Sequence, residues 1–158
     1  MIAETFAAAR QAPPPRVEKV LLATDLSEAS GAATDEAFEL ARRLEASLLV
    51  VSVIDPGSLL LGGRYLTRVD QVRGRREVIA QALVERGREV GVPVSFLVWE
   101  GDPGDMIVSA AEAEHADMVV VGSHNRGAVG RFFLGSVSEH VVRRAPCPVL
   151  VVRPRERA

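Results

Sequence analysis

Five short apolar runs, separated by stretches with helical periodicity, constrain the fold of this 158-residue chain more than any other feature. The runs cover residues 20–23, 48–54, 94–99, 118–121 and 149–152. Most of them do not alternate apolar with polar residues, which is typical of strands that are covered on both faces of a parallel sheet. The third run contains Ser95 and is expected to lie at an edge. The pattern therefore predicts an α/β fold with five parallel strands.

The stretches between the runs predict amphipathic helices. The first places Ala33, Ala37, Leu40, Ala41 and Leu44 on one stripe. The second, at about residues 66–90, is expected to turn Val72, Ile79, Leu83 and Val90 inward, although two glycines weaken it. Strands that alternate with helices imply right-handed crossovers and an open sheet with helices on both faces.

A third helix is predicted at about residues 103–115, with Asp102 as its N-cap and Pro103 in its first turn, and a fourth at residues 137–144. In open α/β sheets, ligands bind beyond the carboxyl ends of the strands, where the winding direction reverses. The search for function therefore narrows to those strand ends.

Composition excludes several classes of function. The chain has 21 acidic and 19 basic residues and a net charge of -2, so no overall field favours nucleic acid or an anionic membrane as a partner. Cys147 is the single cysteine, which excludes an internal disulfide framework. With no convincing signal peptide and no apolar run of membrane-spanning length, we expect a cytoplasmic protein. Residues 1–16 are expected to form a flexible arm, residues 17–153 one domain and residues 154–158 a tail.

Two strand ends carry polar residues that suit a ligand. The first strand ends in Ala23 and Thr24 and is followed by Asp25 and, two residues later, Ser27. Asp25 or Ser27 is expected to cap the next helix, and the Asp25 carboxylate can also accept a hydrogen bond from a ribose hydroxyl or a base amino group.

The glycine-rich segment at residues 122–136 follows the fourth strand and leads into a helix that starts near Ser136. Glycines permit close backbone approach, and exposed N–H groups at a helix N-terminus bind anions. Ser136 and Glu139 also have the spacing of a capping box. The glycine spacing excludes both the GxxxxGK[ST] phosphate loop and the GxGxxG dinucleotide motif.

Several of these segments together resemble the universal stress protein family. The resemblance rests on the glycine-rich segment and on residues 24–27, 51–55, 101–103 and 145–152, and it extends over about residues 17–153. It implies a Rossmann-like, adenine nucleotide alpha hydrolase-like fold with strand order 3-2-1-4-5. That order would bring Asp25 and Gly122 into one crevice.

The resemblance also implies a nucleotide-binding site. In nucleotide-binding members the motif is a glycine, two residues, a second glycine, nine residues, then glycine and serine or threonine. Carried over to this chain, the site residues are Ala23, Thr24, Asp25, Val53, Val121, Gly122, Asn125, Gly135, Ser136, Val137 and Ser138. Asn125 stands where the motif has its second glycine, and asparagine tolerates left-handed backbone geometry better than most residues.

The sequence therefore predicts a regulatory domain of the stress response that binds ATP or a related adenine nucleotide, which Mg²⁺ can accompany. One alternative is a nucleotide-free interaction module whose site is altered by Asn125, and another is a slow ATP hydrolase. No catalytic residue or metal site is predicted, while Arg126 and Arg131 are candidates to reach phosphate oxygens. A homodimer through the last strand, Val149–Val152, and an unidentified protein partner are expected.

Overall fold

Five parallel strands form a single sheet in the order β3-β2-β1-β4-β5, as expected from the family resemblance. The strands are β1 (Lys19–Ala23), β2 (Ser47–Ile54), β3 (Val94–Glu100), β4 (Met118–Gly122) and β5 (Val149–Val152). The structure is a computed structural model that describes residues 13, 15–59, 65–123 and 135–154. Because β1 pairs with both β2 and β4, the winding direction reverses at β1. The prediction that the third strand lies at an edge is confirmed.

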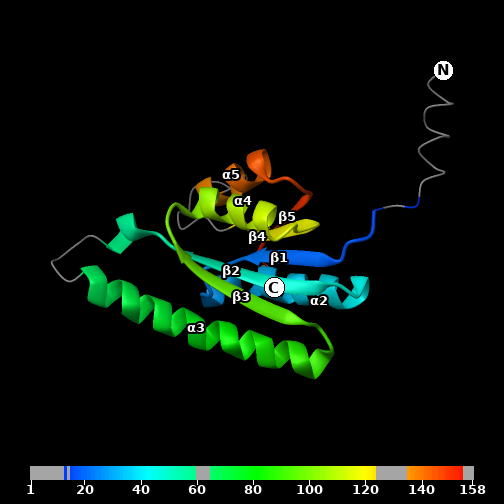
Figure 1. Cartoon of the computed structure of the whole chain (residues 1–158), viewed down its shortest axis with the longest axis horizontal. Helices are drawn as coiled ribbons and strands as arrows, with labels where there is room; N and C mark the ends of the chain where they lie inside the picture. Colours follow the sequence, from blue (N-terminus) through cyan, green and yellow to red (C-terminus); the bar gives the residue numbers. More distant parts are fainter. Residues whose placement is uncertain (1–12, 14, 60–64, 124–134, 155–158) are drawn as a thin grey trace, which may run out of the picture.

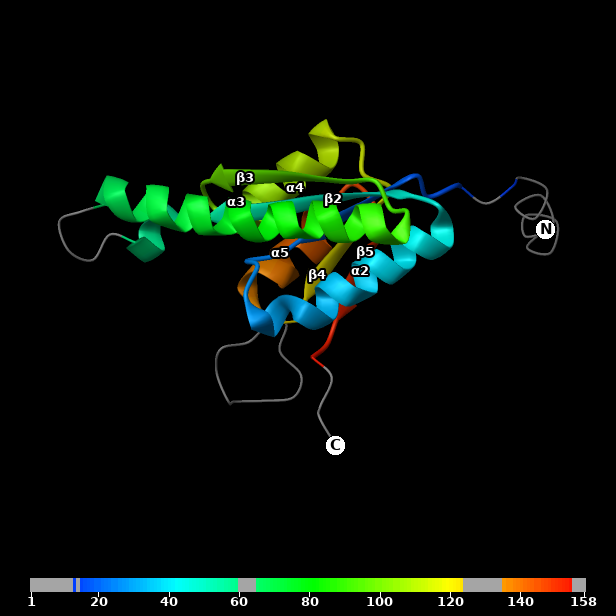
Figure 2. The ribbon, with the colours of Figure 1, turned by 90° about the horizontal axis from the view of Figure 1, so that it is seen from below.

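Helices cover both faces of this sheet. Figure 1 shows α4 (Pro103–Ala113) and α5 (Ser136–Arg144) above the strands. The opposite face is covered by α2 (Gly31–Leu44) and the long α3 (Tyr65–Val90), as Figure 2 shows most clearly. Two short 3₁₀ turns, Glu28–Ser30 and Pro56–Leu59, follow β1 and β2. This is the doubly wound arrangement that the alternating sequence pattern predicts.

Each face of the sheet packs its own core, because successive side chains of a strand point to opposite faces. On β1, Leu21 belongs to the core beneath α4 and α5, whereas Val20 and Leu22 belong to the core beneath α2 and α3. All three are fully buried. Covered on both faces, the central strands β1, β2 and β4 are buried except at their ends, and this explains why their sequences show no alternation.

The inward stripe of α3 differs from the predicted one. Ile79 and Val90, which were expected inside, are 42% and 45% exposed. The side that faces the sheet instead carries buried or half-buried residues at helical spacing, namely Val69, Val72, Arg76, Ala80, Leu83 and Gly87. Val72 and Leu83 face inward as predicted, whereas the expectation for Ile79 and Val90 was wrong because the observed stripe includes an arginine and a glycine, which a search for apolar residues passes over.

Gly87 allows α3 to approach β3 closely. A Cβ atom at this position would lie 2.4 Å from the Val94 Cγ2 atom and 2.5 Å from the Val92 carbonyl oxygen. Such distances are far shorter than van der Waals contact. The glycine that weakens the helix in the sequence is therefore required by its packing.

The remaining helix predictions hold with small changes at the ends. Asp102 is the N-cap of α4, and its side chain accepts a hydrogen bond of 3.1 Å from the Asp105 N–H, as predicted. On the stripe of α2, Ala33, Ala37 and Ala41 are buried, Leu40 is half-buried and Leu44, at the end, is 37% exposed.

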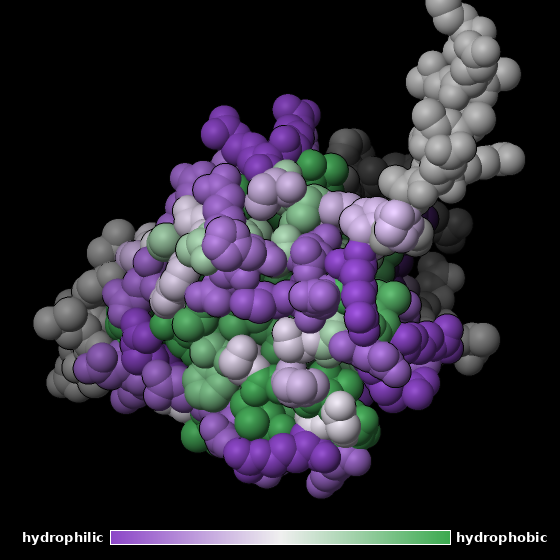
Figure 3. All heavy atoms as spheres, turned by 45° about the vertical axis from the view of Figure 1, so that its right-hand side comes forward, coloured by the Kyte–Doolittle hydropathy of each residue, from purple (hydrophilic) through white to green (hydrophobic). Residues whose placement is uncertain are grey.

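The surface combines hydrophilic and hydrophobic areas. In Figure 3, hydrophobic side chains gather in the lower half of the face that is turned to the reader, between bands of hydrophilic ones. Large apolar side chains that are exposed over the described residues are Leu44, Val78, Ile79, Val90 and Val142. Within the described parts of the chain, none of the helices combines the length and the apolar character that crossing a bilayer requires.

Candidate functional site

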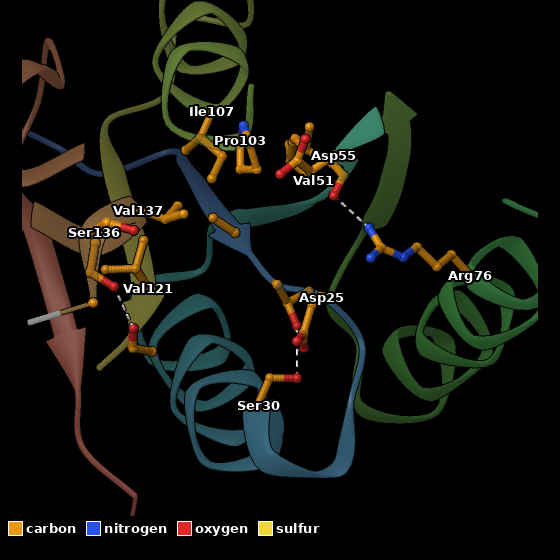
Figure 4. A pocket seen from close by; sticks show the side chains of 16 residues that line it. Asp25, Ser30, Val51, Asp55, Arg76, Pro103, Ile107, Val121, Ser136 and Val137 are labelled. Carbon is orange, nitrogen blue, oxygen red and sulfur yellow. Dashed lines mark hydrogen bonds between the residues drawn. The ribbon is translucent and has the colours of Figure 1, made fainter. Parts of the chain in front are cut away.

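A pocket of about 410 Å³ opens at the carboxyl ends of β1, β2 and β4, where the winding direction reverses. Its position is the one that open α/β sheets use for ligands. Of the predicted site residues, Ala23, Thr24, Asp25, Val53, Val121, Gly122, Gly135, Ser136, Val137 and Ser138 line it. Asn125, together with Arg126 and Arg131, lies outside the described residues. Segments that are far apart in the sequence are thus brought into one cavity (Figure 4).

One end of the pocket is the first turn of α5. Gly135 is the N-cap of this helix and Ser136 its first residue. The first N–H groups of a helix have no acceptor within the helix, so this turn presents donors and a partial positive charge to the cavity. The Ser138 hydroxyl donates a hydrogen bond of 2.7 Å to the Gly122 carbonyl oxygen and so ties α5 to the end of β4.

The predicted capping box at Ser136 is wrong. The helix begins one residue earlier than the box requires, and the Gly135 N-cap makes no side-chain capping bond. Glu139 instead pairs with Arg143 at 2.7 Å, and its N–H donates to the Gly135 carbonyl oxygen. Without the box, the Ser136 side chain does not compete for the N–H groups of the first turn.

The end of β1 forms a tight polar turn. Asp25 Oδ1 accepts hydrogen bonds from the Ser27 N–H at 2.9 Å and from the Ser27 hydroxyl at 2.6 Å. The Thr24 hydroxyl donates to Ser30 Oγ and accepts from the Leu26 N–H. Ser27, one of the two predicted candidates, is the N-cap of the 3₁₀ turn Glu28–Ser30, although its side chain makes no capping bond; the N-cap of α2 itself is Ser30. The turn holds the Asp25 carboxylate at the pocket.

Arg76 also lines the pocket, and the sequence reasoning missed it. One guanidinium nitrogen, Nη1, donates to the Val53 carbonyl oxygen at 2.6 Å and to the Ser52 hydroxyl at 3.1 Å. Burial lowers the pKa of Arg76 from its ordinary value, while the Asp25 carboxylate opposes that shift. The side chain remains a cation at neutral pH because arginine starts from so high a pKa. Arg76 is the one basic residue among the described residues that line this pocket.

A signal for Arg76 is present in the sequence. The position belongs to the inward stripe of α3, four residues before the buried Ala80 and four after Val72. An arginine on an inward stripe needs acceptors, and the end of a neighbouring strand supplies them.

The remaining lining residues that were not predicted are Ser30, Val51, Asp55, Pro103 and Ile107. Val51 and Ile107 are buried and give the cavity an apolar wall between its two polar ends. Asp55 accepts a hydrogen bond of 2.9 Å from the Gly57 N–H in the turn after β2. A pocket with an apolar wall and a few fixed polar groups is suited to a small organic ligand.

The sequence profile of the universal stress protein family matches residues 16–153. The chain belongs to the universal stress protein family. A Thermus aquaticus universal stress protein is 38% identical over 135 residues, which are 85% of this chain and 97% of that protein.

Solved structures agree with the observed fold. The universal stress protein of Lactobacillus plantarum matches with a TM-score of 0.70 and 26% identity, over 88% of this chain and 99% of that one. A universal stress protein described in complex with cAMP matches with a TM-score of 0.67 and 26% identity, over 88% of this chain and 98% of that one. The family and its Rossmann-like α/β fold are thereby established for this chain.

Proposed function

We propose that this universal stress protein binds an adenine nucleotide, with ATP as the leading candidate, and acts as a cytoplasmic regulatory domain in a stress response. The observation that carries the proposal is the convergence of the first turn of α5 and Asp25 on one pocket at the strand ends. The N–H groups of the helix turn can bind phosphates, and the Asp25 carboxylate can accept hydrogen bonds from ribose hydroxyls.

The chemistry of the pocket fits such a ligand in each part. The phosphates would lie against Gly122 and the N–H groups that open α5, where a lysine is not needed. The sugar would lie near Asp25 and the base against the apolar wall formed by Val51 and Ile107. Mg²⁺ would bind mainly through the phosphate oxygens, as is usual for that ion. The volume of about 410 Å³ lies within the range of small-ligand pockets.

A relative supports the same class of ligand, since the universal stress protein described with cAMP shares this fold over most of its length. The alternative function is a nucleotide-free interaction module in which Asn125 has altered the site. Both functions are compatible with a homodimer through β5, whose four residues are half-buried at the edge of the sheet. Light scattering on the purified chain would test the dimer, and a monomer at all concentrations would exclude it.

Isothermal titration with Mg-ATP tests the proposal, with Asn125→Gly measured in parallel because it restores the motif of nucleotide-binding relatives. Binding by the parent chain supports a nucleotide-regulated domain. Binding only by Asn125→Gly favours the interaction module, in which the pocket persists without its ligand. If neither protein binds at millimolar ATP, the nucleotide proposal is wrong.

A further inference from the structure

Asp55 lies on the side of the pocket opposite to the first turn of α5. Figure 4 shows Ser136 and Val137 on one side of the cavity, and Asp55 and Arg76 on the other. If the phosphates of a nucleotide lie against α5, the base is left for the side of Asp55 and Arg76. The edge of the base would then meet one carboxylate and one guanidinium.

The Asp55 carboxylate is oriented by the turn in which it lies. Asp55 directly follows β2, and its Oδ1 atom accepts a hydrogen bond of 2.9 Å from the Gly57 N–H. A Cβ atom at Gly57 would lie 3.2 Å from that same oxygen, so the glycine leaves room for the carboxylate over the turn. A carboxylate offers about four lone-pair positions and no donor. The bond from Gly57 therefore orients Asp55 without exhausting its capacity to accept a hydrogen bond from a ligand.

Arg76 adds donors on the same side of the pocket. Its Nη1 atom donates to the Val53 carbonyl oxygen at 2.6 Å and to the hydroxyl of the buried Ser52 at 3.1 Å. These partners hold the guanidinium in place before any ligand arrives. A guanidinium carries five N–H groups, whereas both of these hydrogen bonds come from one nitrogen. This side of the pocket thus presents an acceptor and donors together.

Adenine and 6-oxo purines differ in what they present to such a surface. Adenine carries an amino group at position 6 beside a ring nitrogen that accepts, whereas a 6-oxo purine carries an acceptor oxygen there. A carboxylate can accept a hydrogen bond from the amino group, and the guanidinium can donate to the ring nitrogen. The oxygen of a 6-oxo purine would instead face a negative charge, and such a mismatch is an effective source of specificity.

We propose that Asp55 is a specificity-determining residue, which accepts a hydrogen bond from the amino group of adenine and so selects adenine over 6-oxo purine nucleotides. The inference deepens the proposed function and rests on it. Asp25, at the end of β1, is left for the sugar.

Glu100 provides a matched control at the same edge of the sheet. It ends β3, where it is the register partner of Ile54, the residue before Asp55. Its carboxylate pairs with Arg73, and it does not line the pocket. Replacing Glu100 therefore removes the same charge from a neighbouring strand end and leaves the lining of the pocket unchanged.

The test compares Mg-ATP with Mg-ITP, which share sugar and phosphates and differ along the base edge that carries position 6. Dissociation constants are measured by isothermal titration for the parent, Asp55→Ala and Glu100→Ala. In the parent, we expect the ITP constant to exceed the ATP constant by roughly tenfold or more, the effect of one hydrogen bond to a charged group. Asp55→Ala should bring the two constants to within about twofold of each other, while Glu100→Ala should keep the ratio of the parent to within about twofold.

Purine riboside triphosphate, which has a hydrogen atom in place of the amino group, identifies the contact. Its affinity should agree between the parent and Asp55→Ala to within about twofold, because it has no amino group for the carboxylate to bind. If it loses as much affinity as ATP does, Asp55 contacts the sugar, the phosphates or Mg²⁺, and the inference is overturned.

An unchanged ratio in Asp55→Ala, or an equal fall in Glu100→Ala, would also overturn the inference while leaving nucleotide binding intact. If the parent binds none of these nucleotides, the proposed function fails and this inference fails with it. Circular dichroism and thermal melting establish that each variant is folded. Should Asp55→Ala not fold, Asp55→Asn decides, because its amide keeps an acceptor for the Gly57 N–H and can also donate to the oxygen of ITP. The ratio must fall in that variant too, and an unchanged ratio there would overturn the inference.

Discussion

The two ends of the pocket are built from different parts of the protein. At the α5 end, the groups that face the cavity are backbone N–H groups and glycines, with Gly122 and Gly135 beside the helix start. At the opposite end, Asp25 and Arg76 face it, and these are side chains from two elements that are far apart in the sequence. A site made of backbone depends on the path of the chain, whereas a site made of side chains changes with single substitutions. The two ends should therefore respond to different kinds of substitution.

The largest effect should come from removing one backbone donor at the α5 end. Ser136→Pro deletes the N–H of the first helical residue, a position where proline is well tolerated. The preceding Gly135 already has φ -59° and ψ 154°, which is the conformation that a residue before proline prefers. We expect ATP affinity to fall by roughly tenfold to a hundredfold, about 1.5–3 kcal/mol, as for a hydrogen bond to a charged group.

Ser136→Ala is the control for this variant, because it removes the hydroxyl but keeps the N–H. Titration calorimetry should give it an affinity close to that of the parent, since the Ser136 side chain does not cap α5. If Ser136→Ala loses as much affinity as Ser136→Pro, the side chain rather than the backbone makes the contact. The contrast between the two ends would then disappear.

A smaller effect is expected from Asp25→Ala at the side-chain end. Losing one hydrogen bond to the sugar should weaken ATP binding by roughly fivefold, about 1 kcal/mol. The parent should lose a similar factor with 2′,3′-dideoxy-ATP, and Asp25→Ala should not distinguish the two nucleotides. Fluorescence competition measures all four affinities, and a variant that still prefers the ribonucleotide would place the sugar elsewhere.

The smallest effect concerns the helix that carries Arg76. Gly74 lies two residues before it, is exposed, and would place a Cβ with no atom within 4 Å. Gly74→Ala should raise the free energy of unfolding by about 0.5–1 kcal/mol, the usual difference in helix propensity. Urea denaturation measures the gain. ATP affinity should not change because Gly74 does not line the pocket, and if it did change, the backbone of α3 would influence the end of the pocket that Arg76 lines.

Sequence reasoning located the backbone end better than the side-chain end. Gly122, Gly135 and Ser136 stand out because glycines and a helix start carry local signals that survive without knowledge of the fold. The signal for Arg76 is weaker, because an arginine on the inward stripe of α3 reaches the cavity only once the helix is packed on the sheet.

The strands were predictable for a related reason. Burial on both faces of the sheet removes polar residues from β1 after its first residue, Lys19, and this leaves an unmistakable apolar run. The capping residues were less predictable, because the Asp25 carboxylate accepts hydrogen bonds from Ser27 and does not cap α2. At α5 the helix starts one residue earlier than predicted, and this difference is enough to make Gly135 rather than Ser136 the N-cap.

The hydrogen bond from Ser138 to Gly122 joins residues that are 16 positions apart in the sequence. This hydrogen bond holds the two ends of the intervening segment in place. No atom of that segment takes part in it. A stretch bounded in this way can be exchanged between relatives, lengthened or redesigned while the strand and helix that support it stay in place. For evolution and for protein engineering alike, it is a natural place to graft a new ligand preference onto an unchanged scaffold.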